Sequence, residues 1–98
     1  MKKPVVWSRD ALDDVIDASV FVAQENPSSA TRLADRLESA GNALSDFQTG
    51  RPGRQAGTFE KIVPRTRYII VYRVTGNYVS IVRVIHTARH WGGGDAPG

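Results

Sequence analysis

The chain has 98 residues, 41% of them hydrophobic, and a formal net charge of +3. A chain of this length can build one hydrophobic core with little surplus, so we expect a single small domain. The absence of cysteine excludes disulfide scaffolds, thiolate zinc sites and a cysteine nucleophile. No apolar run reaches the length of a signal peptide or a membrane span, so we expect a cytoplasmic protein without membrane contact.

The charge is distributed unevenly along the chain. Residues 1–47 carry five basic and eight acidic side chains, a net charge of −3, whereas residues 48–98 carry eight basic and two acidic ones, a net charge of +6. This gradient suits an acidic partner of the second half, either nucleic acid or an acidic protein segment. The alternative interpretation is a dipolar surface that only favours solubility.

The first half predicts a short strand and two helices. Residues 4–7 form the strand, and Ser8 or Asp10 then caps a helix by accepting its free first amides. Within this helix, the residues that recur at helical spacing are Leu12, Val15, Ile16, Ser19, Val22 and Ala23. Asn26 and Pro27 end this helix and start another. The second helix carries an apolar stripe at three- and four-residue spacing, formed by Ala30, Leu33, Ala34, Leu37, Ala40, Leu44 and Phe47. Together the two helices predict an αα-hairpin.

The second half predicts a loop followed by strands. The loop covers residues 48–56, which contain Gly50, Pro52 and Gly53. Segments rich in β-branched and aromatic residues follow at 58–63, 67–74 and 78–85. The predicted fold is therefore an α+β domain over residues 1–91, ordered β-αα-βββ, with the helix hairpin on one face of a mainly antiparallel four-stranded sheet. Residues 92–98 are too rich in glycine to fold and are expected to be a flexible tail.

A tight turn at Gly76 and Asn77, with positive φ angles, fixes a register for the last two strands. The expected opposite pairs are Arg67–His86, Ile69–Val84, Val71–Val82 and Arg73–Ser80. The more apolar face, expected under the helices, carries Tyr68, Ile70, Tyr72, Val74, Val79, Ile81, Arg83 and Ile85. Arg83 would then be a buried structural cation that pairs with Asp14 or Asp17 of the first helix.

These segments resemble the RelE/ParE toxin superfamily over about residues 4–91. The resemblance is carried by "DDVIDASVFVAQENPSSA", "GRPGRQAGTFEKIV", "RYIIVYRV" and "VSIVRVIHTARHW". It implies the same β-αα-βββ fold and a toxin of a type II toxin–antitoxin module. RelE-like members cut mRNA in the ribosomal A site, ParE-like members poison DNA gyrase, and each toxin is neutralised by an antitoxin encoded beside it.

The nuclease alternative requires several polar groups that converge on one phosphate. If the chain were a nuclease, its catalytic candidates would be His86, Arg67 and Lys61. The resemblance, however, places Thr87 where some nucleases carry a tyrosine and Ile69 where they carry an arginine.

The ending "RVIHTARHW" is more similar to the ParE-like branch, which implies a gyrase inhibitor without catalytic chemistry or a cofactor of its own. It also implies a ParD-like antitoxin with an acidic, helical C-terminal segment, which forms a hetero-oligomer with the toxin. The alternatives are a ribosome-dependent mRNA endonuclease and a toxin-fold protein that is no longer toxic.

The candidate partner-binding residues are Arg51, Arg54, Lys61, Arg65, Arg67, Arg73, His86, Arg89 and Trp91. We interpret His86 and its neighbours as a binding edge, although a strand-end histidine bonded to the backbone is the alternative. Arg51 and Arg54 could equally be solvent-exposed cations, and Trp91 a lid over the sheet edge. His86 and His90 lie four residues apart without a nearby carboxylate, so no metal site is expected.

Overall fold

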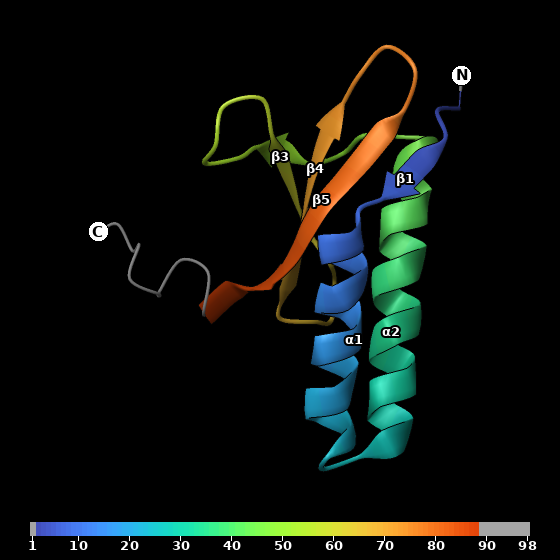
Figure 1. The fold of residues 1–98 in the computed structure, drawn as a ribbon, viewed down its shortest axis with the longest axis vertical. Coiled ribbons are helices and arrows are strands. Elements are labelled where there is room, and N and C mark those ends of the chain that lie inside the picture. The colour runs from blue at the N-terminus through green and yellow to red at the C-terminus, as the bar shows by residue number, and fades with distance from the viewer. Residues whose placement is uncertain (1, 89–98) are drawn as a thin grey trace.

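The computed structural model describes residues 2–88, and in it two helices lie against one face of a sheet (Figure 1). The elements in chain order are β1 (Val5–Trp7), α1 (Arg9–Ala23), α2 (Pro27–Asn42), a short 3-10 helix η1 (Ala43–Ser45), β2 (Arg51–Pro52), β3 (Phe59–Ile62), β4 (Tyr68–Val74) and β5 (Val79–His86). The predicted α+β class and the helix hairpin are confirmed.

The sheet has five strands in the order β1-β5-β4-β3-β2 rather than the four that the sequence predicts. β1 is parallel to β5, and the other neighbours are antiparallel. The additional strand β2 lies inside the predicted loop, where Arg51 pairs with Glu60 and Pro52 with Phe59. Proline is tolerated there because β2 is an edge strand and needs fewer amide donors.

Both predicted helix starts are confirmed in their hydrogen bonding. Ser8 caps α1, since its Oγ accepts a hydrogen bond from the Ala11 amide at 3.0 Å. Asn26 caps α2 in the same way through the Ser29 amide at 3.1 Å, and Pro27 occupies the first turn. These caps satisfy amides that have no partner within the helix.

The core lies between the helices and β4 and β5. Its fully buried large side chains include Leu37 and Leu44 from the helical part and Tyr72, Ile70 and Ile81 from the sheet. Three residues of the predicted stripes are instead exposed: Leu12 by 46%, Ile16 by 58% and Phe47 by 74%. In α1 the buried residues are Ala11, Val15 and Ala18, so the face toward the sheet is rotated away from Leu12 and Ile16.

A β-bulge changes the predicted register of β4 and β5. Near the turn, Arg73 lies opposite Ser80 as expected. The register shifts between Val71 and Tyr72, so that beyond it Val71 pairs with Arg83. The other three predicted pairs are therefore wrong by one residue: the structure has Tyr68–His86, Ile69–Ile85 and Ile70–Val84. A bulge adds one residue to one strand, and every residue beyond it faces the opposite side.

The bulge also reverses which residues of β5 face the helices. Val84 is 3% exposed and belongs to the core, whereas Ile85 is only partly buried. Arg83 was expected under the helices, but half of its side-chain surface is exposed. The prediction of a buried arginine is therefore wrong, because it assumed an unbroken alternation along β5.

The turn between β4 and β5 does contain Gly76 and Asn77, but neither has a positive φ angle. The turn is closed by Thr75 instead. Its Oγ1 accepts hydrogen bonds from the amides of Asn77 at 3.1 Å and Tyr78 at 2.9 Å. The Thr75 side chain thus closes a turn for which positive φ angles at Gly76 and Asn77 were predicted.

The helix hairpin is longer than the sheet it covers. The corner between α1 and α2 lies well beyond the end of the strands, and the β3–β4 turn faces the middle of the hairpin (Figure 1). The inner face of the hairpin near its corner is therefore left without strands against it. Among residues 2–88, no helix is long and apolar enough to cross a membrane.

Candidate functional site

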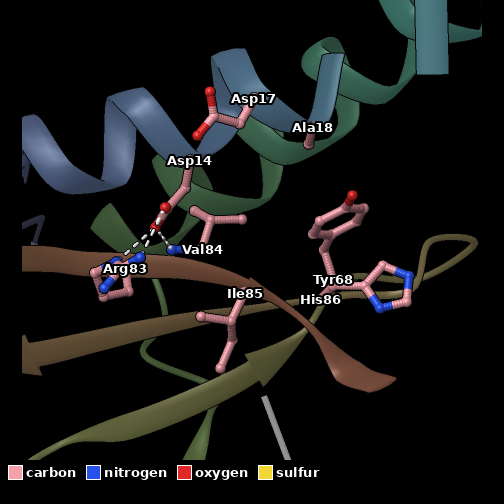
Figure 2. A pocket seen from close by; sticks show the side chains of 8 residues that line it. All are labelled: Asp14, Asp17, Ala18, Tyr68, Arg83, Val84, Ile85 and His86. Carbon is pink, nitrogen blue, oxygen red and sulfur yellow. Dashed lines mark hydrogen bonds and ion pairs between the residues drawn. The ribbon is translucent and has the colours of Figure 1, made fainter. Parts of the chain in front are cut away.

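The end of β5 lies beside α1, where β1 no longer pairs with it. Asp14 projects from α1 toward this edge, as Figure 2 shows, and its carboxylate accepts three hydrogen bonds. Two come from Arg83, from Nε at 2.8 Å and Nη2 at 2.9 Å, and the third comes from the Val84 amide at 2.9 Å. The Asp14 side chain is only 14% exposed. Asp14 thus ties α1 to β5, and of the two predicted partners of Arg83, Asp14 and Asp17, the structure shows Asp14.

The electrostatics of this pair follow from its geometry. The hydrogen bond to Asp14 raises the pKa of the Arg83 guanidinium, and this effect outweighs the opposing one of burial. A bidentate arginine–carboxylate pair fixes orientation as well as charge. Arg83 therefore has a structural role at the edge of the sheet, although it is not buried.

Tyr68 at the start of β4 and His86 at the end of β5 lie opposite each other. Their ring centroids are 5.2 Å apart and the planes are nearly perpendicular at 88°. The Nδ1 atom of His86 accepts a hydrogen bond from the Ala88 amide at 3.1 Å, and the Thr87 amide donates to the Arg67 carbonyl at 2.9 Å. The position of His86 is therefore fixed by ring contact and by backbone bonding.

Two pockets meet at His86. The first, a cleft of about 350 Å³, lies over β5 and is lined by the Asp14–Arg83 pair, Asp17, Tyr68 and His86 (Figure 2). The second, of about 360 Å³, lies on the other side, between the helix hairpin and the β3–β4 turn. Arg65 and Arg67 of that turn line it together with His86, so the structure brings three of the predicted partner-binding residues to one pocket.

Other predicted partner-binding residues lie elsewhere. Arg51 is on β2, and the Arg54 amide donates to the Glu60 carboxylate at 3.1 Å in the β2–β3 connection. Arg73 reaches the Ala56 carbonyl of the same connection at 3.5 Å. Lys61 is on β3 and lines neither pocket that His86 lines. Arg89, His90 and Trp91 lie outside the described residues. Over residues 2–88, no cluster of three or more histidine, cysteine or acidic side chains could hold a metal ion.

The sequence prediction missed the contribution of α2 and α1 to the second pocket. Arg32 and Arg36 of α2 and Phe21 of α1 line it, although helical spacing places them outside the apolar stripes. Arg32 and Arg36 are four residues apart and flank Leu33, so they share one side of the helix. The four-residue spacing predicts that Arg32 and Arg36 lie on the same side of α2. It does not predict that the helix hairpin extends past the end of the sheet.

Comparison with known proteins places this geometry in a family. The ParE toxin family of type II toxin–antitoxin systems, parDE, matches residues 5–91. Toxin RelE2 of Caulobacter vibrioides is 36% identical over 86 residues, which cover 87% of this chain and 96% of RelE2. The protein Y4kP of Sinorhizobium fredii is 31% identical over 91 residues, which cover 92% of this chain and 94% of Y4kP.

Solved structures show the same fold. A chain of the chromosomal ParDE TA system from P. aeruginosa superposes with a TM-score of 0.79 at 20% identity, over 87% of this chain and 96% of that one. A chain of the toxin–antitoxin complex RelBE2 from Mycobacterium tuberculosis superposes with a TM-score of 0.56 at 27% identity, over 88% and 99%.

The helix hairpin on a mainly antiparallel sheet is thus the fold of the RelE/ParE toxin superfamily. Within it, the chain belongs to the family of ParE toxins of type II toxin–antitoxin systems.

Proposed function

We propose that this chain inhibits DNA gyrase, blocks replication, and is neutralised by an antitoxin encoded beside it. The observation that supports gyrase over RNA as the target is the dispersal of the candidate catalytic groups. Arg67 and His86 line one pocket, but Lys61 does not join them. His86 is engaged with Tyr68 and with the Ala88 amide. RNA cleavage needs a base, an acid and cations around one phosphate, and this arrangement supplies only part of that set.

Ribosome-dependent mRNA cleavage is the second candidate. The 36% identity with toxin RelE2 favours it, as does the presence of His86 and Arg67 at one pocket. Under this alternative His86 would be the general acid or base. Its replacement by alanine would then reduce cleavage by about 10²–10⁴-fold.

The antitoxin assignment is supported by the structural neighbours and by charge. One neighbour belongs to a chromosomal ParDE TA system and another to the toxin–antitoxin complex RelBE2. The second half of this chain carries a net charge of +6, which suits an acidic partner segment that folds as it binds.

The toxin assignment is tested by expression in the native host. Expression of the chain alone should stop growth, and coexpression with the neighbouring reading frame should restore it. Normal growth during solitary expression, with the protein present at the same level, would contradict the proposal.

A further inference from the structure

The second pocket has a composition that no role described so far explains. Four arginines line it: Arg32 and Arg36 from α2, and Arg65 and Arg67 from the β3–β4 turn. Its apolar lining consists of Phe21, Val22 and Leu33, and we call these three residues the floor. We call this site the arginine pocket. Its lining contains no acidic residue, and within residues 2–88 none of the four arginines forms an ion pair.

The apolar floor exists because the hairpin extends past the sheet. Leu33 belongs to the stripe that packs on the core, but it is only partly buried at this end of the molecule. Phe21, near the end of α1, is 66% exposed. An exposed phenylalanine beside a half-covered leucine is apolar surface that a partner can remove from water.

The four arginines of the pocket are like charges without an ion-pair partner among residues 2–88. They repel each other. Of the four, only Arg32 makes a side-chain hydrogen bond within the same residues, from Nη2 to the Ser29 Oγ at 3.1 Å. Arg65 also adopts a left-handed backbone, with φ at 66°. Glycine is the residue that accepts this conformation without strain, so an arginine at this position sacrifices stability. Strain of this kind is typical of functional sites.

We propose that the arginine pocket receives an acidic segment of the antitoxin, with one apolar side chain on the floor and carboxylates against the arginines. This inference rests on the proposed antitoxin partner. Arginine forks bind carboxylates in a bidentate manner, and arginine is one of the residues enriched in binding hot spots. The apolar floor favours a protein side chain over a nucleic acid, which would follow an extended basic track.

The position of the pocket also explains how binding would neutralise the toxin. His86 lines the arginine pocket as well as the cleft over β5. A segment seated in the pocket therefore covers one side of the binding edge. Antitoxin and target would compete for His86 and Arg67, and no conformational change is needed for neutralisation.

The test measures the affinity of purified full-length toxin variants for the purified antitoxin encoded beside the toxin gene, by titration calorimetry at two salt concentrations. Arg36→Glu, Arg65→Gly and Phe21→Ala should each weaken binding by at least about tenfold. Arg65→Gly should do so without loss of stability in urea, because glycine relieves the left-handed strain. Arg9→Glu is the charge-matched control, since Arg9 is an exposed residue at the opposite end of α1, and it should bind like the wild type.

The other outcomes are informative. If wild type binds the antitoxin and all three variants bind within twofold of it, the pocket assignment is wrong and the proposed function stands. If Ile16→Ala weakens binding tenfold and Phe21→Ala does not, the antitoxin binds the outer stripe of α1, and the assignment is again wrong. A third outcome uses a 20-nucleotide oligo-dT as the ligand. If Arg36→Glu weakens binding of this oligonucleotide but leaves the affinity for the antitoxin unchanged, the pocket is a nucleic-acid site and the assignment is wrong. If wild type fails to bind the antitoxin at all, the proposed function itself is contradicted.

Discussion

Replacement of Asp14 by alanine tests how α1 is held to the sheet. The carboxylate accepts two hydrogen bonds from Arg83 and one from the Val84 amide. Loss of the arginine contacts should cost about 0.5–1 kcal/mol, since half of the Arg83 side chain is exposed and water can replace Asp14 there. Loss of the acceptor for a partly buried amide adds about 1–3 kcal/mol. Asp14→Ala should therefore destabilise the fold by about 1.5–4 kcal/mol.

The matched variant Arg83→Ala should cost less, about 1 kcal/mol, because it leaves the bond between Asp14 and Val84 in place. Asp14→Asn should lie between the two, since its amide oxygen can still accept from Val84. A double-mutant cycle of Asp14→Ala with Arg83→Ala should give a coupling energy of about 0.5–1 kcal/mol.

Urea unfolding, followed by far-ultraviolet circular dichroism at neutral pH, measures all four stabilities. The reasoning is refuted if Arg83→Ala is more destabilising than Asp14→Ala. That order would mean that the guanidinium, not the amide of β5, is the important partner of Asp14. A coupling energy of zero would show that the ion pair contributes nothing to folding.

Three further predictions concern the core. Leu37→Ala should cost about 2–5 kcal/mol in urea unfolding, because Leu37 is fully buried; unchanged stability would mean that the stripe of α2 does not face the sheet. Gly41→Ala should lower the melting temperature even though alanine favours helix by about 1 kcal/mol, because its Cβ would lie 2.7 Å from Cη2 of Trp7 and overpacking costs about 1–3 kcal/mol; a higher melting temperature would show that Trp7 moves freely. Tyr72→Phe should cost about 1 kcal/mol at neutral pH through the lost bond from the Gly50 amide. Burial raises the pKa of the Tyr72 hydroxyl, so its contribution is complete below the unfolded pKa of about 10 and is lost as pH rises through the folded value. The stability of Tyr72→Phe should therefore fall less than that of wild type in alkaline urea titrations, and identical pH profiles would refute this.

The helices were predictable from sequence because their signals are local. Ser8, Asn26 and Pro27 each act within one turn of the residue they cap, and the structure uses them as expected. The exposure of Leu12 and Ile16 was not predictable from spacing alone. A helix whose inner face consists of small residues such as Ala11 and Ala18 packs close to the sheet, and larger apolar residues remain outside.

The strands β1, β3, β4 and β5 were predictable from sequence, whereas β2 and the register beyond the turn were not. The bulge at Val71 and Tyr72 has no local signature such as a glycine, so unbroken alternation was the natural assumption. Asp14 was one of the two acids predicted for Arg83, together with Asp17, although that prediction assumed a buried arginine and Arg83 is half exposed. The arginine pocket was not found, since it depends on how far the hairpin extends past the sheet.

The central claim is tested most directly by mixing the purified toxin with gyrase, supercoiled plasmid and ATP, and in parallel with ribosomes that carry a defined mRNA. The account predicts that linear plasmid accumulates in the first reaction. In the second, primer extension should reveal intact mRNA. Codon-phased mRNA cuts that disappear in His86→Ala, together with unaffected gyrase, would contradict the account and identify the chain as an mRNA endonuclease.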